Sequence, residues 1–528
     1  MRGLAGRLTT LLALAALAVT ATASSGAAAS PARMPIHGVV PHSPHLAHAP
    51  HMLSTVIGTA GPAALTFDAN YQTVIDRYFA DVAHDSGALD NVYSVATQYS
   101  DSTGPVQYLA AFGGSYVSHD PLPASGCNDG LNTYCLTDRQ LQDEIQSVLT
   151  AKGWTGGLDH IFFLLTPSGV GSCFDQFGQC STDTFCAYHD AFTDSNNDPA
   201  IYANEPYEGP IPGCTSSTQG FPNDIDGDTT INTISHEHNE AITDPLGDGW
   251  LAKDGSENGD LCAYGFGTQT NPGGGAYNQV INGHHYDLQQ EYSNLDNGCI
   301  QHTGGSPATA PTSGTGPLLY GGGPVMHTNT SYVIYWLPTA RNTSAPTISG
   351  TAIVGRTLTT STGSWAAGGA PYSYQWQRCS STGTSCVDIS GATSTTYKLT
   401  TADGGHVVRS TVRATNVNGA SPPAASVGAK RVIDLPALTK APHISGHARV
   451  GKKLSGSHGA WTYGPRYHLQ WLRCNAHGAS CRKVPHATRA SYKLTARDFR
   501  HRLRLRVTAT NAAGSLVATS PASARVGH

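Results

Sequence analysis

The stretch Thr233-Ile-Ser-His-Glu-His-Asn-Glu-Ala-Ile-Thr-Asp-Pro245 organises the chain, because it combines an apolar repeat of helical period with a histidine and several carboxylates. At 100° per residue, one face of the predicted helix is apolar and carries Ile231, Ile234, Ala241 and Ile242. The opposite face is polar and carries His236, Glu237, Glu240 and Asp244. Asp228 or Thr229 is expected to cap the N-terminus of the helix. We expect the apolar face to pack into the domain and the polar face to form the functional site.

The polar face has the spacing of a metal site. His236 and Glu240 lie one helical turn apart, so an imidazole nitrogen and a carboxylate oxygen can bind the same ion. Zinc peptidases carry H-E-x-x-H on such a helix, and here the fifth position is Glu240. The pattern predicts His236 and Glu240 as zinc ligands and Glu237 as the general base that activates water. The other interpretation is a solvated helix face whose charged side chains compensate one another.

Neighbouring residues extend this prediction. His238 points with the isoleucines, so we expect a hydrogen-bonded histidine on the packed face rather than a ligand. The stretch Ser256-Glu-Asn-Gly-Asp-Leu-Cys262 supplies two further carboxylates, and Glu257 or Asp260 is expected to be the third ligand. For both acids the alternative role is turn or capping chemistry. A disulfide from the cysteine that ends this stretch, with Cys299 as one possible partner, would hold the loop against the domain.

The length and the cysteines indicate where the protein works. A chain of 528 residues is long enough for three or four domains. Residues 1–29 begin with basic residues, continue with an apolar run and end in small residues, which predicts a secretory signal peptide. No later run reaches the roughly 20 apolar residues of a membrane span. The twelve cysteines form an even set without a C-x-x-C motif, which favours disulfides and predicts a secreted, extracellular protein that can associate with the cell wall.

The order of the segments predicts an α/β fold for the first domain, with a zincin-like α+β fold as the variant. Residues 30–64 are rich in Pro and His and are predicted to be a disordered leader. The domain at 65–302 contains helical patterns, a predicted strand around Val92–Tyr99, and an apolar run at 158–165 that is typical of a strand buried on both faces. Residues 303–317 form a Ser/Thr/Pro/Gly linker.

Three stretches of this domain resemble a group of secreted actinobacterial proteins that are distantly similar to the plant phosphate-induced, Exordium-like family: Ile234–Pro245, Glu257–Cys262 and Tyr277–His284. The resemblance covers about residues 65–302. That family pairs a H-E-x-x-E helix with a G-E-I-G-D-x-C loop, and this chain departs from the loop motif with Ser256 and Asn258 on either side of Glu257. The resemblance implies a fold and a metal site more than a defined reaction.

The segment after the linker belongs to the first domain rather than to the tail. Residues 318–340 include a strand-like run of aromatic and β-branched residues, Ser331–Leu337. In the similar proteins a G-G-P-V-M-H stretch precedes the first helix, whereas here Gly322–His327 follows the whole domain. We infer a circular permutation of one strand, in which Ser331–Leu337 returns to the sheet of the 65–302 domain.

Residues 345–433 and 441–528 are an internal repeat, and each copy contains a Trp-x-x-Cys motif, a Tyr-Lys-Leu-Thr motif and strand-like alternation. The copies resemble the all-β immunoglobulin-like sandwich modules of secreted proteins. Each copy holds two cysteines with six residues between them: Cys379 and Cys386, and Cys474 and Cys481. Because these separations are short, both pairs are expected to be local disulfides rather than bridges between sheets.

The net charge of −5 hides an uneven distribution. The second repeat holds fifteen Lys and Arg residues against one acid, Asp498, so the rest of the chain is strongly acidic. Four arginines alternate with other residues and are expected to line one face of a strand: Arg500, Arg502, Arg504 and Arg506. This basic surface predicts binding to a cell-wall polyanion, and a merely solvated strand is the alternative.

These observations together predict a secreted zinc-dependent metallohydrolase, with a peptidase acting on polypeptides as the preferred class. The alternative is a non-catalytic extracellular protein that binds the cell wall or a polysaccharide through its repeats. The sequence lacks the G-x-S-x-G motif of many serine hydrolases, whereas a glycosidase stays compatible because its paired carboxylates have no fixed spacing. We expect a monomer with no membrane span and no specific nucleic-acid partner.

Overall fold

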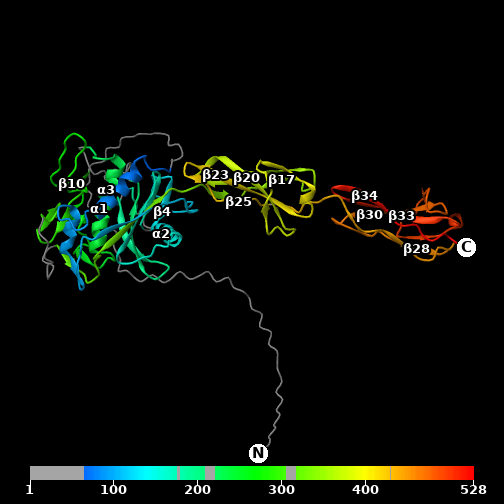
Figure 1. The fold of residues 1–528 in the computed structure, drawn as a ribbon, viewed down its shortest axis with the longest axis horizontal. Coiled ribbons are helices and arrows are strands. Elements are labelled where there is room, and N and C mark those ends of the chain that lie inside the picture. Colours follow the sequence, from blue (N-terminus) through cyan, green and yellow to red (C-terminus); the bar gives the residue numbers. More distant parts are fainter. Residues whose placement is uncertain are drawn as a thin grey trace, which may run out of the picture. The chain divides into compact units, whose positions relative to one another are not determined.

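The computed structural model describes residues 65–174, 179–182, 184–207, 214, 220–304, 317–427 and 430–528. The predicted signal peptide (1–29), the predicted leader (30–64) and most of the predicted linker (303–317) lie outside the described residues. The described part of the chain is mostly β (Figure 1). None of its helices is both long enough and apolar enough to cross a membrane.

A five-stranded sheet forms the centre of the first domain. Its strands lie in the order β3 (Ala110–Ser118), β15 (Asn329–Trp336), β5 (His160–Leu165), β8 (Pro199–Glu205) and β7 (Tyr188–Thr193). Neighbouring strands are parallel except β7, which runs antiparallel to β8 at the edge. The apolar run that the sequence singled out is β5, and its side chains from Ile161 to Leu165 are fully buried.

Helices cover both faces of this sheet. On one face, α1 (Tyr71–His84) and α3 (Ile225–Thr243) pack against the odd-numbered side chains of β5. On the other face, α2 (Asp138–Lys152) packs against the even-numbered ones. Because β5 is covered on both sides, its sequence is continuously apolar rather than alternating. The sheet therefore gives α3 a rigid support.

Short elements surround the sheet. They are η1 (Val92–Gln98), β1 (Ser100–Asp101), β2 (Gly104–Pro105), β4 (Tyr134–Thr137), β6 (Val170–Cys173), β9 (Trp250–Ala252), η2 (Asp260–Cys262), β10 (Gln279–Ile281), β11 (His284–Tyr286), β12 (Glu291–Ser293), β13 (Gly298–Ile300) and β14 (Leu318–Tyr320). They pair only in twos: β1 with β2, β4 with β6, β9 with β14, β10 with β11, and β12 with β13. The pairing of β14 with β9 ties the segment after the linker to the region that follows α3.

Two local predictions were wrong. The segment predicted as a strand around Val92–Tyr99 is the 3₁₀ helix η1, whose start is capped by the Asn91 side chain, which accepts a hydrogen bond from the backbone N–H of Tyr93. The site helix begins earlier than expected, and its N-cap is Asp224 rather than Asp228 or Thr229. In both cases the residue directly before the helix carries a polar side chain that accepts from free backbone N–H groups and so fixes the start.

The strand β15 lies in the interior of the sheet, between β3 and β5, although it follows them in the chain by more than 150 residues. The sequence led us to expect Ser331–Leu337 in this sheet. Trp336, at the end of β15, is 2% exposed and packs in the core on the α2 side, and its indole N–H donates to the backbone oxygen of Asp120. Without β15, β3 has no partner in this sheet.

We predict that Trp336→Ala lowers the free energy of unfolding of the first domain by about 3–5 kcal/mol, because it removes a large aromatic side chain from a packed core. Urea denaturation followed by circular dichroism measures the change. Leu319→Ala, in the same segment but 49% exposed, is the matched control and should change stability little. Equal stability of the two variants would show that β15 does not support the sheet.

Glu144 is a buried carboxyl group on α2, with 6% of its surface exposed. Burial raises its pKa to about 7, against the opposing effect of a hydrogen bond with Ser118. A carboxyl group whose folded-state pKa lies above its unfolded value binds its proton more tightly in the folded state. The free energy of unfolding should therefore fall as the pH rises from about 4.5 to 7.

We predict that Glu144→Gln removes this part of the pH dependence, because the amide does not ionise. At pH 5 the variant and the parent should have similar stability, and at pH 8 the variant should be more stable by about 2–3 kcal/mol. Thermal unfolding at several pH values measures the difference. A variant that is less stable than the parent at both pH values would contradict the assignment.

The first repeat consists of two antiparallel sheets. One sheet has the order β17 (Ile348–Gly350), β18 (Thr357–Thr360), β22 (Thr396–Lys398). The other has the order β21 (Val387–Asp388), β20 (Gly369–Cys379), β23 (Val407–Asn416), β24 (Gly419–Ala420), with β25 (Ala424–Ala425) also on β23. Beside them lie β16 (Arg341–Ser344), β19 (Ser364–Ala366) and η3 (Thr401–Asp403). A core around Trp376 fills the space between the sheets, which is the arrangement of an immunoglobulin-like sandwich.

The second repeat has the same arrangement around Trp471. Its sheets have the orders β27 (His443–Ser445), β28 (Lys453–Ser457), β32 (Ser491–Lys493) and β31 (Arg482–Lys483), β30 (Arg466–Cys474), β33 (Arg502–Asn511), β34 (Gly514–Thr519). Beside them lie β26 (Leu438–Lys440), β29 (Ala460–Trp461) and η4 (Ala496–Asp498). The predicted local disulfides are present in both copies, Cys379–Cys386 and Cys474–Cys481.

The arginines of β33 differ in part from the prediction. Leu503, Leu505 and Val507 are fully buried, so the alternate arginines lie on the outer face of the strand, as expected. Arg500 is not one of them, because it precedes β33 and has a left-handed backbone with φ of 65°. Arg502 and Arg504 donate hydrogen bonds to backbone oxygens of flanking loops. Part of this basic face therefore stabilises the repeat itself.

Candidate metal site

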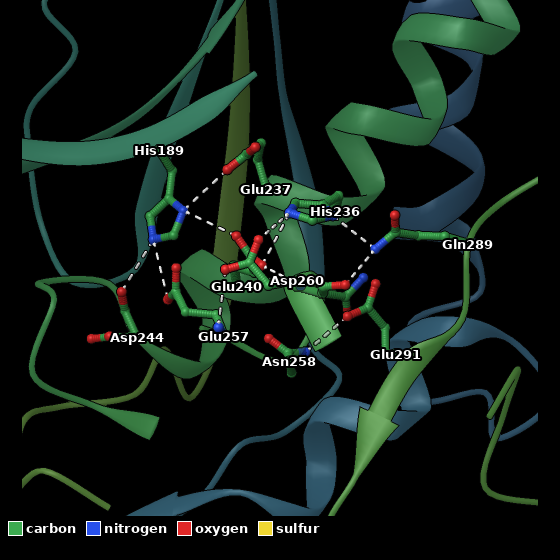
Figure 2. Close-up of polar contacts among 12 residues, drawn as sticks. His189, His236, Glu237, Glu240, Asp244, Glu257, Asn258, Asp260, Gln289 and Glu291 are labelled. Atoms are coloured by element: carbon green, nitrogen blue, oxygen red, sulfur yellow. Dashed lines mark hydrogen bonds and ion pairs between the residues drawn. The ribbon is translucent and has the colours of Figure 1, made fainter. Parts of the chain in front are cut away.

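The polar face of α3 is buried, which rules out the interpretation as a solvated helix face. Glu237 is 5% exposed and Glu240 is 2% exposed. The face looks onto β7, the loop at 256–262 and the segment that contains Gln289 (Figure 2). Burying several carboxylates is costly unless cations or hydrogen-bond donors compensate them.

A first group of potential metal ligands joins α3 to the loop. The Nε2 atom of His236 lies 3.0 Å from Oε1 of Glu240 and 3.8 Å from Oδ1 of Asp260. The three ligand atoms are all within 4.8 Å of one another. The backbone N–H of Asp260 also donates to Oε1 of Glu240 at 2.8 Å. Of the two acids that the sequence left open, Asp260 is the one that joins His236 and Glu240.

The imidazole of His236 is oriented by a contact on the side away from the carboxylates. Nε2 of the Gln289 side chain lies 2.8 Å from Nδ1 of His236, so the other ring nitrogen faces the carboxylates. Gln289 is itself held by Asn232, whose side-chain oxygen accepts the backbone N–H of Gln289 at 2.8 Å. A fixed second layer of this kind is typical of histidines that bind metals.

A second histidine, His189, faces α3 from the edge strand β7, and the sequence analysis did not identify it. Its Nδ1 atom lies 3.2 Å from Oε2 of Glu237 and 3.8 Å from Oε2 of Glu240. Its Nε2 atom lies 3.3 Å from the backbone oxygen of Asp244 and 3.7 Å from Oε1 of Glu257. Figure 2 shows His189 and His236 on opposite sides of Glu240. A second group of possible ligands is formed by the imidazole of His189 and the carboxylates of Glu237 and Glu240.

The electrostatics of the pocket follow from its burial and its excess of acids. Burial, reinforced by Glu240, raises the pKa of Asp260 to about 7 and that of Glu257 well above its usual range. Burial opposes protonation of His189, but the hydrogen bond to Glu237 and the nearby carboxylates raise its pKa to about 9. The pocket therefore favours positive charge, whether from a proton or from a metal ion.

Other contacts fix the loop that carries Asp260. Cys262 is bonded to Cys299, which the sequence had offered as one possible partner. The Asn258 amide donates to Oε2 of Glu291 at 3.0 Å, and its oxygen accepts from Thr243 at the end of α3. A Cβ atom at position 259 would lie 2.9 Å from Oε1 of Glu240 and 3.1 Å from Nδ1 of His236, so a side chain there would have to displace the two ligand residues.

His238 has the role that the sequence predicted. It is fully buried on the opposite side of α3, where its Nδ1 lies 3.0 Å from the Tyr93 hydroxyl and its Nε2 lies 3.0 Å from Oδ1 of Asn329. Burial lowers its pKa to about 4, so it is neutral at physiological pH. It therefore belongs to the core.

The residues around α3 line a pocket with a volume of about 60 Å³. One water needs roughly 10–15 Å³, so ions and a few waters fit inside. Besides the acids and the two histidines, aromatic side chains contribute to the lining: Phe174, Phe185, Tyr188 and Tyr264. The donor set of imidazole and carboxylate groups at these distances fits zinc.

A third group of possible ligands is chemically unavailable. Sulfur atoms of Cys127, Cys135 and Cys173 lie close together, but Cys127 is bonded to Cys135 and Cys173 to Cys180. Cys186–Cys214 completes the set of six disulfides, and no cysteine is free in the part of the chain that the structure describes. Six disulfides fit an extracellular protein.

Comparisons with known proteins add little to this geometry. No protein-family model matches the chain, and no curated protein matches it. The solved structures that match include the FN1–FN3 domains of chicken CNTN1, with 16% identity over 34% of this chain and 65% of that chain and a TM-score of 0.22. Domains A168–A170 of titin match with 16% identity over 40% of this chain and 73% of that chain, with a TM-score of 0.20. Such low TM-scores do not establish a shared fold, and the immunoglobulin-like description of the repeats rests on their sheets.

Proposed function

We propose that this protein is an extracellular zinc-dependent hydrolase whose first domain cleaves peptide bonds. The observation that carries the proposal is the convergence of His236, Glu240 and Asp260, from a helix and a disulfide-linked loop, in a buried pocket. A bound zinc ion polarises a carbonyl group and makes its water more acidic, which is the chemistry that hydrolysis needs.

The side chains of the pocket have distinct roles in this proposal. His236, Glu240 and Asp260 hold the ion, and Gln289 keeps the imidazole in place. In a centre with one ion, Glu237 takes the proton from the attacking water, the role that the sequence suggested. The aromatic residues of the lining favour an apolar side chain next to the bond that is cleaved.

The kinship with the Exordium-like family is also a proposal. It is supported by the contact between the two motifs that carry the resemblance, because the backbone N–H of Asp260 in the loop donates to Glu240 of the H-E-x-x-E helix. Two motifs that are separate in the sequence thus form one site. This contact supports a site of the same type and says nothing of the substrate.

We predict that Glu237→Gln retains the ion at His236 and loses hydrolysis by at least about 100-fold, because the amide cannot accept a proton or replace a carboxylate ligand. His236→Ala should lose both that ion and the activity. Metal content by mass spectrometry and cleavage of a quenched fluorescent peptide library measure the two effects.

His84→Ala is the control, since His84 is exposed on α1 and lies outside the pocket. It should leave both readouts unchanged. Unchanged hydrolysis in Glu237→Gln would disprove the role of this carboxylate. A zinc-loaded parent that cleaves no peptide in the library would disprove the peptidase class.

The second repeat supports a further function, attachment to an anionic cell-wall polymer. Its one acid, Asp498, is buried and paired with Arg473 at 2.7 Å, so no acid is left in this repeat to neutralise its other bases. On the outer face, Leu472 of β30 lies between two bases, Lys483 on one neighbouring strand and Arg504 on the other. Arg506 follows two residues further along β33. A row of cations of this kind attracts a polyanion.

The first repeat shows that this charge is not required by the fold. Its Arg378–Asp403 pair, at 2.7 Å, matches the Arg473–Asp498 pair. The position of Arg506 is taken by Thr411, that of Arg502 by Val407 and that of Lys483 by Asp388. These three positions are thus basic only in the second copy, whereas Arg504 corresponds to Arg409 of the first.

We predict that the full chain sediments with purified cell-wall material at low salt and is released near 1 M salt, because the screening length there is about 3 Å. The double variant Arg506→Thr, Lys483→Asp should bind more weakly. Its matched control, Arg409→Thr with Lys398→Asp, makes the same change of charge in the first repeat and should bind like the parent. Binding that ignores salt, or that both variants weaken equally, would contradict this function.

A further inference from the structure

We propose that the pocket holds two zinc ions, the second between His189, Glu237 and Glu240, and that Glu240 bridges them. This inference rests on the proposed function, because the first ion is the one held by His236, Glu240 and Asp260. The water that attacks the substrate would then lie between the two ions. No sequence motif indicates the second position.

The two oxygens of Glu240 point to different histidines. Oε1 lies 3.0 Å from Nε2 of His236, and Oε2 lies 3.8 Å from Nδ1 of His189. A carboxylate in this arrangement can give one oxygen to each of two ions. In two-metal hydrolytic sites the ions lie about 3.5–4 Å apart.

The second group has the geometry of a ligand set on its own. Nδ1 of His189 lies 3.2 Å from Oε2 of Glu237, and the three ligand atoms of His189, Glu237 and Glu240 lie within 4.8 Å of one another. The groups come from a strand and a helix that are both fixed by the central sheet. Rigid elements hold ligands more accurately than loops do.

The outer side of His189 favours metal binding at Nδ1. Its Nε2 atom lies 3.3 Å from the backbone oxygen of Asp244, which can only accept a hydrogen bond. Metal binding at Nδ1 would leave the single proton of a neutral imidazole on Nε2, where this backbone oxygen can accept it. Asp244 is fixed in turn, because its Oδ1 accepts the backbone N–H of Gly249 at 2.7 Å.

The charges of the pocket agree with two ions. Four carboxyl groups line it: Glu237, Glu240, Glu257 and Asp260. Burial makes ionised carboxylates costly without nearby cations, and ions at both ligand groups place a cation beside more of these acids than one ion does. Two of these four acids are ligands of the first ion, Glu240 and Asp260, and a second ion adds Glu237 as a third acidic ligand.

A second ion changes the role of Glu237. One oxygen of its carboxylate would become a ligand, and the other would remain to take the proton of the attacking water. His189 becomes a ligand as well, rather than a cation that compensates the acids. The two-ion centre therefore needs β7 as much as the loop at 256–262.

The test is the zinc content of the full chain. The protein is loaded with Zn²⁺, dialysed against a weak chelator and analysed by mass spectrometry, together with His189→Gln, Glu237→Gln and the double variant His189→Gln, His236→Ala. The double variant defines the background from histidines elsewhere in the chain. We expect two ions above this background in the parent and one in each of His189→Gln and Glu237→Gln. His84→Ala, the exposed control, should keep two.

Circular dichroism establishes that each variant is folded, and anomalous diffraction at the zinc edge locates the ions directly. Two peaks about 3.5–4 Å apart on either side of Glu240 support the proposal. One ion that depends on His236 and not on His189 overturns the second site and leaves the proposed hydrolase intact. No zinc above background in the parent overturns both.

Discussion

The burial of the polar face of α3 is the constraint on which the rest of the first domain depends. A carboxylate removed from water must find a cation or several donors, and α3 buries Glu237 and Glu240 side by side. A helix with this sequence would be unfavourable alone. It becomes stable when His189 from β7 and the N–H of Asp260 from the loop are brought against it. The need to compensate the acids thus links segments that are far apart in the sequence.

The sheet provides the fixed geometry that this compensation requires. The apolar face of α3 packs with α1 on the odd-numbered side chains of β5, so the helix cannot turn its polar face to solvent without leaving the core. Among the described strands β7 pairs with β8 alone, which places His189 at the sheet edge, where it faces α3. On the other side, the Cys262–Cys299 disulfide limits the movement of the loop. The sheet, the helix packing and the disulfide thus position the chemical groups of three elements around one pocket.

The sequence was informative where the structure follows local rules. Helical period identified both faces of α3, the buried character of β5 was visible in its continuous apolar run, and His238 was assigned to the core from its position on the helix. The choice between Glu257 and Asp260 could not be made, because the two lie three residues apart in a loop and only the fold decides which one faces His236. His189 gave no signal, since its partners are nonlocal and its strand is short. η1 was mistaken for a strand because its β-branched and aromatic residues favour strands, and the Asn91 cap was not recognised.

The two repeats separate what the sandwich needs from what one copy adds to it. Both copies keep the core tryptophan, the local disulfide and the buried Arg–Asp pair. The first copy builds the same two sheets with seven Lys and Arg residues and two acids, whereas the second has fifteen and one. Arg502, which replaces Val407 of the first copy, donates hydrogen bonds to backbone oxygens of flanking loops. The remaining excess has no acid to pair with inside this repeat, and it is on this charge pattern that the proposed binding to a polyanion rests.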